Sequence, residues 1–246
     1  MSKKLIDTLN KVFPEQNYIY SGENDLVGLY GILLMRQAFL KGKINILDIS
    51  ENKTGKFNLG NKGFITFGFQ YKNRILFSIV SGHLESGLEK NDKRIETLKG
   101  ILNKEITTDS DRIRRFKESD FWIILGDLNF RIGIKSYDVA MNLIMEKNYN
   151  ALYCMDQFHL AYEDNDFLKN NINEGTLNFE PTYKFEKNSD NYTYDKAKIR
   201  VPAWCDRIFY CKKDAIKIMS YDSARNLKLS DHRPVIAAFE VFPDKI

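Results

Sequence analysis

Residues 121–129 read Phe121-Trp122-Ile123-Ile124-Leu125-Gly126-Asp127-Leu128-Asn129, an apolar run that leads directly into polar residues. Such a run predicts a buried β-strand, and Gly126 permits a sharp exit from it. Strand alternation would place Asp127 and Asn129 on the same side. The carboxylate can then orient a water molecule while the amide donates to a phosphoryl oxygen, although Asp and Asn are also ordinary turn residues. The segment predicts a strand whose end carries either a catalytic pair or a plain turn.

Four further polar blocks end or interrupt predicted strands in the same way. They are Ser81-Gly82-His83-Leu84, Pro181-Thr182-Tyr183-Lys184, Pro202-Ala203-Trp204-Cys205-Asp206-Arg207 and Ser230-Asp231-His232-Arg233-Pro234. The five blocks together supply carboxylates, an amide, imidazoles and cations, the groups that metal-assisted phosphoester hydrolysis needs. In this interpretation Asp231 approaches a metal or its waters, His232 contacts a phosphate or the nucleophile, and Asp206 fixes the tautomer of His232. A polar loop that opens an edge strand is the alternative for residues 230–234.

Two groups of basic residues are candidates for binding phosphate. The first adds Lys198 and Arg200 to Tyr183, Lys184 and Arg207. Several cations with a tyrosine could bind a multiply phosphorylated ring, although solvated surface charge is the commoner fate of Lys and Arg. The second group lies in the Gly-bracketed turn Gly60-Asn61-Lys62-Gly63. A phosphate could sit on the backbone amides of this turn, but a plain turn explains it equally well.

The apolar pattern predicts an α/β fold. Leu5, Ile6, Leu9, Val12 and Phe13 recur at helical spacing, and helical patterns also occupy residues 88–106, 136–148 and 149–168. Strand-like runs outnumber them, at residues 26–36, 44–49, 64–69, 75–80, 121–125, 208–211, 216–220 and 235–242. Residues 71–74 look like a hairpin connection. We therefore expect a two-sheet sandwich of mixed or mostly antiparallel sheets, flanked by helices.

The length and composition suit one large globular domain, or at most two small ones. The chain has 246 residues and a net charge of +4, which suits an anionic partner without identifying one. Its cysteines, Cys154, Cys205 and Cys211, form no CxxC pair and favour a reducing compartment. The first residues are too polar for a signal peptide, and no Cys-x5-Arg phosphatase signature is present. No basic and aromatic run suits a nucleic-acid groove. We expect a cytoplasmic monomer, with any contact with membranes peripheral.

At this point the blocks resemble the catalytic domain of the inositol polyphosphate 5-phosphatases, within the exonuclease–endonuclease–phosphatase superfamily. Gly126-Asp127-Leu128-Asn129 and Ser230-Asp231-His232 match the superfamily, whereas Pro181-Thr182-Tyr183-Lys184 and Trp204-Cys205-Asp206-Arg207 match the 5-phosphatases. The resemblance runs from about residue 4 to about residue 240. It implies a two-sheet α/β sandwich and Mg²⁺-dependent removal of the 5-phosphate from phosphoinositides or soluble inositol phosphates.

The resemblance also implies a role for each matching residue. Asp127 would orient or deprotonate the attacking water, and Asn129 would stabilise the phosphoryl group. His232, oriented by Asp206, would hold the phosphate, with His83 on its other side and Asp231 near the metal. The neighbouring 4-phosphate would be gripped by Tyr183, Lys184, Lys198 and Arg200. Arg207 would help to hold the substrate, as would the turn that carries Asn61 and Lys62.

The match is incomplete at the N-terminus. The family domain normally opens with a strand carrying Trp-Asn and a strand ending in Gln-Glu, whose Asn and Glu supply metal ligands. Here Met1 falls at about the helix that follows, and smaller departures occur at Phe64 and Ile95. We interpret residues 1–246 as a single catalytic domain, truncated at its N-terminus relative to the family. The alternatives are a catalytically dead phosphoinositide-binding pseudophosphatase, a domain completed by a partner's strands, and a nuclease of the same superfamily.

Overall fold

The computed structural model describes residues 2–40, 43–54, 60–108, 112–197, 199–242 and 245. Its internal contacts divide the chain into two compact units. The first comprises Met1–His83 and Gly100–Ile124, and the second comprises Leu84–Lys99 and Leu125–Lys245. Two elements cross the division, the helix α3 (Asn91–Asn103) and the strand β8 (Phe121–Asp127). The expectation of a single domain stays a prediction.

The first unit begins with the helix α1 (Ser2–Val12), which the spacing of its apolar residues predicted. The strands β1 (Tyr18–Leu26) and β2 (Leu29–Arg36) then form an antiparallel hairpin, followed by the short helix α2 (Gln37–Leu40). The sequence missed β1, whose Gly, Glu, Asn and Asp residues have low strand propensity. The strand predicted over residues 26–36 is confirmed from Leu29 as β2, but Leu26 ends β1 instead, and β2 is half-buried.

The strands β3 (Ile44–Lys53), β4 (Gly63–Tyr71) and β5 (Ile75–His83) pair antiparallel in the first unit. The central strand β4 is buried from Gly63 to Gln70, which explains its nearly continuous apolar sequence. The predicted hairpin over residues 71–74 is confirmed, and Lys72 and Asn73 adopt the positive φ angles that tight hairpin turns require. The strands β6 (Glu105–Thr107) and β7 (Ile113–Arg115) form a small separate ladder.

The described part of the second unit contains four short α-helices after β8. Three fall within the predicted helical regions, and the last extends beyond the predicted residues 149–168 to Asn171. The four are α4 (Tyr137–Met145), α5 (Tyr149–Tyr153), α6 (Gln157–Glu163) and α7 (Asp166–Asn171). Each begins after a polar N-cap whose side chain accepts from a backbone N–H of the first turn. The caps explain why this region breaks into several helices rather than one. The caps are Ser136, Asn148, Asp156 and Asn165.

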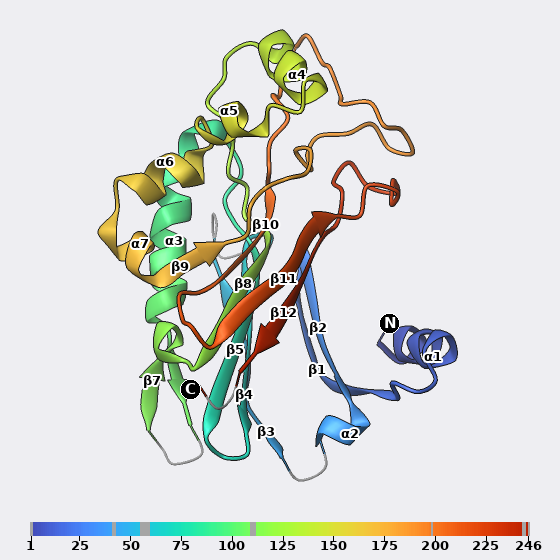
Figure 1. The fold of residues 1–246 in the computed structure, drawn as a ribbon, viewed down its shortest axis with the longest axis vertical. Helices are drawn as coiled ribbons and strands as arrows, with labels where there is room; N and C mark the ends of the chain where they lie inside the picture. The colour runs from blue at the N-terminus through green and yellow to red at the C-terminus, as the bar shows by residue number, and fades with distance from the viewer. Residues whose placement is uncertain are drawn as a thin grey trace. The chain divides into compact units, whose positions relative to one another are not determined.

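Two antiparallel strand pairs complete the second unit (Figure 1). In one pair, β10 (Asp206–Cys211) lies beside the short strand β9 (Ile172–Glu174). In the other, β11 (Ile216–Ser223) pairs with β12 (Val235–Val241) over almost its whole length. The strands predicted at residues 208–211, 216–220 and 235–242 are therefore confirmed.

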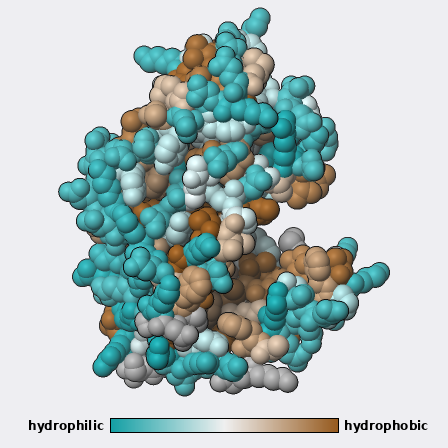
Figure 2. Space-filling model, viewed as in Figure 1, coloured by the Kyte–Doolittle hydropathy of each residue, from teal (hydrophilic) through white to brown (hydrophobic). Residues whose placement is uncertain are grey.

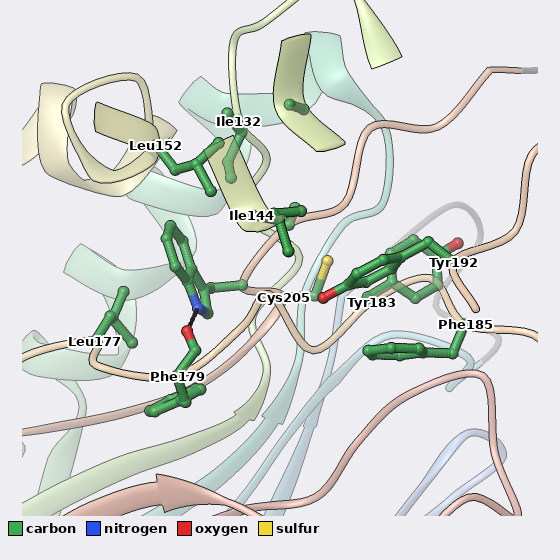
Figure 3. Packing of buried hydrophobic residues seen from close by; sticks show 12 residues of the cluster. Ile132, Ile144, Leu152, Leu177, Phe179, Tyr183, Phe185, Tyr192 and Cys205 are labelled. Carbon is green, nitrogen blue, oxygen red and sulfur yellow. Dashed lines mark hydrogen bonds between the residues drawn. The ribbon is translucent and has the colours of Figure 1, made fainter. Parts of the chain in front are cut away.

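A buried cluster of the second unit packs the polar loops together (Figure 3). Trp204 is fully buried in it, and its indole N–H donates to the carbonyl of Phe179 at 2.9 Å. Tyr183 forms isolated antiparallel bridges with both Ala203 and His232. Three of the five polar blocks are therefore joined through one core. The cluster consists of Ile132, Ala140, Ile144, Leu152, Leu177, Phe179, Tyr183, Phe185, Tyr192, Ala203, Trp204 and Cys205.

The surface carries both hydrophilic and hydrophobic residues. Hydrophilic side chains cover much of the face drawn in Figure 2, and hydrophobic ones are exposed in places, as on ordinary globular proteins. In the first unit, Val12 and Phe13 at the end of α1 are among the exposed apolar residues. Among the described residues, no helix is long and apolar enough to cross a membrane.

Candidate active site

The polar segment after β8 turns sharply at the end of the strand. Gly126 has a φ of 130° and Asn129 a φ of 58°, so the backbone reverses within three residues. The amides of Leu128 and Asn129 both donate to the carbonyl of Cys205, at 2.7 and 3.1 Å. Gly126 adopts a positive φ angle, but β8 continues through it to Asp127 rather than ending at Gly126. The alternation argument for Asp127 and Asn129 was wrong, because the strand ends at Asp127 and the next residues form a turn.

The turn brings the backbone of Asn129 back to the carboxylate of Asp127. The N–H of Asn129 donates to Oδ1 of Asp127 at 3.1 Å, as in an Asx-turn. The side-chain amide of Asn129 is buried, and its Nδ2 donates to the carbonyl of Leu84 at 3.1 Å. Asp127 and Asn129 are therefore held together by a turn rather than by strand alternation.

Asp127, Asp206 and His232 form a compact cluster in the second unit. One ligand atom from each of the three lies within 4.8 Å of the others. Nδ1 of His232 lies 2.9 Å from Oδ2 of Asp206, and the hydroxyl of Thr182 donates to the same oxygen at 2.7 Å. The predicted pairing of His232 with Asp206 therefore has hydrogen-bonding geometry, and Nδ1 carries the shared proton when Asp206 is ionised.

Burial and charge shift the pKa values of this pair. Burial raises the pKa of Asp206, although the hydrogen bond and charge of His232 oppose that shift. Burial alone would lower the pKa of His232, but the hydrogen bond and negative charge of Asp206 outweigh it and raise the pKa above its ordinary value. A histidine with a raised pKa stays cationic to higher pH, which favours contact with an anion.

The donor set of the cluster fits a divalent cation that prefers oxygen. Mg²⁺ is commonly bound through one or two carboxylates and several waters, and Asp127 and Asp206 offer two carboxylates. Asp231, which the sequence placed near the metal, does not belong to the cluster. Its carboxylate lies 3.9 Å from Nζ of Lys184, so its place near a metal stays a prediction.

Tyr183 connects the cluster to a small cationic pocket. Its ring packs on the ring of His232, with 4.4 Å between centroids, and its hydroxyl is hydrogen-bonded to Arg200. The pocket has a volume of about 70 Å³ and is lined by Lys184, Thr193, Asp195 and Arg200. The structure thus brings Tyr183, Lys184 and Arg200 together, as the sequence predicted. Lys198 lies outside the described residues.

Arg207 occupies a different place from the one we expected. Its side chain is completely buried, with Nη1 2.7 Å from Asp156 and Nη2 2.5 Å from Glu174. The guanidinium also lies against the rings of Phe158 and Phe209. Because its nitrogens bind carboxylates inside the protein, we correct the prediction and assign Arg207 to support of the unit rather than to the substrate.

The remaining predicted residues lie in the first unit. His83 is the last residue of β5, and its Nδ1 lies 3.2 Å from the carbonyl of Gly28. Its other ring nitrogen is hydrogen-bonded to Nζ of Lys62, so these two candidates lie side by side. Asn61 is exposed on the same turn. The roles of His83, Lys62 and Asn61 at a phosphate stay predictions.

Two residues of the site were not assigned a role from the sequence. Thr182 is buried and donates to Asp206, and Arg131 is hydrogen-bonded to the side-chain oxygen of Asn129. Thr182 directly precedes Tyr183, and Arg131 lies two residues after Asn129, so each is close to a predicted functional residue. Their chemical type alone carried no signal, because Thr and Arg are ordinary in strand-end loops.

Cys205 lies beside the site, but its thiol is kept in the unreactive, protonated form. Burial raises the pKa of its thiol well above the usual range, and its Sγ lies 3.6 Å from the carbonyl of Phe130. Cys154, in contrast, is exposed. The thiolate is the reactive form, so Cys205 is unsuited to act as a phosphatase nucleophile.

We therefore expect iodoacetamide to alkylate Cys154 in the folded protein and to leave Cys205 unmodified. Peptide mass spectrometry after labelling at pH 8 measures both sites, and labelling in urea provides the control in which all three cysteines react. Rapid modification of Cys205 in the folded protein would contradict this description of the site.

Comparison with known proteins assigns the chain and its fold to one family. A profile of the endonuclease/exonuclease/phosphatase family 2 matches residues 1–238. The chain belongs to this family, and the α/β sandwich predicted from the sequence is confirmed. Within the family, the resemblance to inositol polyphosphate 5-phosphatase catalytic domains is also confirmed.

The relatives that support this assignment are inositol phosphatases. The chain is 30% identical over 221 residues to the type II inositol 1,4,5-trisphosphate 5-phosphatase of Mus musculus, covering 87% of this chain and 22% of that protein. It is 32% identical over 248 residues to the type I inositol polyphosphate 5-phosphatase 4 of Arabidopsis thaliana, covering 96% of this chain and 44% of that protein. The chain thus spans less than half the length of these relatives.

A solved structure shares the fold. It is the inositol polyphosphate 5-phosphatase domain of SPsynaptojanin, in complex with inositol (1,4)-bisphosphate and calcium ion. The TM-score is 0.82 at 27% sequence identity, and the match covers 99% of this chain and 70% of that chain.

Proposed function

We propose that this chain hydrolyses the 5-phosphate of a phosphoinositide or a soluble inositol polyphosphate. The observation that carries the proposal is the cluster of Asp127, Asp206 and His232, connected through Tyr183 to a cationic pocket. The cluster supplies groups that can handle a water molecule and an anionic phosphoryl group. The pocket supplies cations for a second phosphate on the same ring. The names of the relatives support the same reaction and substrate class.

The proposed roles follow from the chemistry of each group. Asp127 would orient or deprotonate the attacking water, and His232 would hold the phosphoryl oxygens as a cation positioned by Asp206. Asn129 and His83 are proposed to contact the same phosphoryl group. Negative charge is shared over several phosphoryl oxygens during the reaction, so fixed donors and cations lower the barrier without a covalent nucleophile.

A divalent cation belongs to the same proposal, with Mg²⁺ as the ion. Asp127 and Asp206 would hold it, with Asp231 nearby, and it would supply positive charge that polarises the phosphoryl group. We also propose an intracellular monomer that reaches a lipid substrate peripherally, at a membrane surface.

Lys184 tests the proposed 4-phosphate site. We expect Lys184→Ala to raise the KM for inositol 1,4,5-trisphosphate by roughly 10- to 100-fold, because a hydrogen bond to a charged group contributes about 1.5–3 kcal/mol. The KM for a substrate with a 5-phosphate but no 4-phosphate should change by no more than about twofold, since that substrate has no partner for Lys184. Steady-state phosphate release with both substrates measures the effect.

The matched control is Lys217→Ala, which removes an exposed lysine of β11 and the same charge. It should leave both KM values unchanged. An equal rise in KM for both substrates in Lys184→Ala would show that Lys184 does not bind the 4-phosphate.

A further inference from the structure

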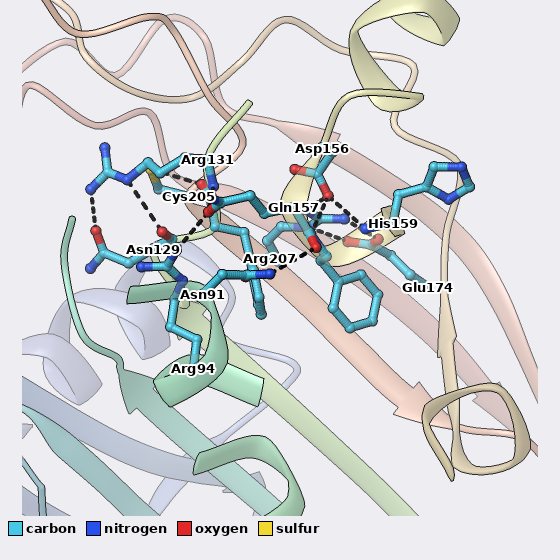
Figure 4. A network of polar contacts seen from close by, with 12 residues as sticks. Asn91, Arg94, Asn129, Arg131, Asp156, Gln157, His159, Glu174, Cys205 and Arg207 are labelled. Atoms are coloured by element: carbon cyan, nitrogen blue, oxygen red, sulfur yellow. Dashed lines mark hydrogen bonds and ion pairs between the residues drawn. The ribbon is translucent and has the colours of Figure 1, made fainter. Parts of the chain in front are cut away.

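Arg131, two residues after Asn129, is a charged residue to which the proposed function gives no role. Its Nε donates to the backbone carbonyl of Asn129 at 3.2 Å, and its Nη2 donates to the side-chain Oδ1 of the same residue. Two contacts to one residue from a planar guanidinium fix direction as well as distance. Figure 4 shows the guanidinium of Arg131 beside the amide of Asn129.

These contacts determine which way the Asn129 amide faces. Guanidinium groups only donate, so the atom that faces Arg131 must be the amide oxygen. The amide nitrogen then faces the carbonyl of Leu84, 3.1 Å away. A flipped amide would place two donors against Arg131 and an oxygen against a carbonyl oxygen. Arg131 and Leu84 therefore specify the orientation of the Asn129 side chain from its two ends.

Gln157 holds the backbone of Arg131 in turn. Its backbone N–H donates to the carbonyl of Arg131 at 2.9 Å, and its Oε1 accepts from the N–H of Arg131 at 3.1 Å. The same Oε1 accepts from the buried guanidinium of Arg94 at 2.6 Å, while Nε2 donates to the carbonyl of Leu88 at 2.7 Å. The side chain of Gln157 thus ties residue 131 to the start of α3, where Arg94 lies (Figure 4).

Arg131 also reaches the residue that connects the acidic cluster to the cationic pocket. Its guanidinium lies 4.8 Å from the centroid of the Tyr183 ring, within the range of a cation–π contact. Tyr183 in turn packs on His232. One side chain therefore contacts both Asn129 and Tyr183.

We propose that Arg131 is a positioning residue, which orients the Asn129 amide and the Tyr183 ring for the reaction without touching the substrate. The inference rests on the proposed function and deepens it. Misplacing a group by about 1 Å can cost about 10²-fold in rate. Loss of Arg131 should therefore lower kcat by about 10²-fold and change KM much less.

A double-mutant cycle tests whether Arg131 acts through Asn129. Phosphate release is compared for the wild type, Arg131→Met, Asn129→Ala and the double variant. If Arg131 acts through the amide, adding Arg131→Met to Asn129→Ala should lower kcat by no more than about twofold. Arg131→Lys keeps the charge but loses the planar pair of contacts, so it should resemble Arg131→Met. An equal loss of kcat in both backgrounds, or full activity of Arg131→Lys, would overturn the proposal.

A second readout separates this inference from the proposed function. The side-chain ¹⁵NH₂ signal of Asn129, assigned by its absence in Asn129→Asp, should be slow to exchange with solvent in the wild type and fast in Arg131→Met. Circular dichroism confirms folding of each variant, and Arg131→Lys replaces Arg131→Met if the latter unfolds. If the wild type releases no phosphate, the proposed function fails. The exchange rates of the Asn129 amide then test by themselves whether Arg131 positions it. Unchanged protection of the Asn129 amide would then refute the role of Arg131.

Discussion

Asp127→Asn is expected to lower phosphate release by about 10³-fold, within the range that a positioned acid–base group contributes. The substitution keeps the size of the side chain and its Oδ1, which accepts from the amide of Asn129. It removes the negative charge, and with it the ability to take a proton from water and to attract a cation. Initial rates at saturating substrate and divalent cation measure the loss.

The control is Asp214→Asn, which removes an exposed carboxylate in the turn before β11. That variant should retain full activity, and both variants should unfold at the same urea concentration as the wild type. If Asp127→Asn kept more than about a tenth of the activity, Asp127 would have no part in the proton transfer.

Arg207→Met is expected to lower the free energy of unfolding by about 3–5 kcal/mol, because it leaves two buried carboxylates without their counter-charge. Asp156 and Glu174 both contact the guanidinium directly. Met has a similar volume and can occupy the space among the surrounding aromatic rings, so the loss is mainly electrostatic. Urea denaturation followed by tryptophan fluorescence measures it.

The loss should depend on pH in a defined direction. Burial raises the pKa of Glu174, opposed by the charge of Arg207. Removing that charge raises the pKa of Glu174 further above its value in the unfolded chain. A carboxyl with a raised pKa in the folded state favours folding at low pH, so the destabilisation should be smaller at pH 5 than at pH 8.

Arg225→Met is the matched control for this prediction. Arg225 also pairs with a carboxylate, Glu180, at 3.0 Å, but its side chain is 58% exposed. Exposed pairs contribute less than about 1 kcal/mol, so this variant should change stability little and without a marked dependence on pH. A similar loss of unfolding free energy in both variants would mean that the stabilisation by Arg207 does not depend on the burial of its ion pairs.

The sequence predicted those parts of the fold that local pattern determines. β4, β5 and β8 are apolar runs bounded by turn residues, and they form where expected. β1 was missed because its residues have little strand preference and it forms by pairing with β2. The half-burial of β2 could not be predicted either, because it too depends on pairing with β1. Pairing between segments is a non-local property that composition does not reveal.

The sequence predicted which residues belong to the candidate site better than it predicted which partners each of them contacts. The pair of His232 and Asp206 was expected from motif chemistry, and the structure gives it a hydrogen bond. Arg207 was misassigned because a charged residue next to a catalytic block looks like a substrate ligand. Its acidic partners lie far away in the sequence, on α6's N-cap and on β9. Neither partner follows from residues 202–207 alone.

The central claim is that this chain removes a 5-phosphate, and the identity of the product tests it most directly. The protein is incubated with inositol 1,4,5-trisphosphate and Mg²⁺, and the products are separated by ion-exchange chromatography and identified by ³¹P NMR. We predict inositol 1,4-bisphosphate and free phosphate, with neither formed in EDTA. Saturable binding of the substrate without turnover would contradict the account and favour a pseudophosphatase, and so would loss of the 1- or 4-phosphate instead.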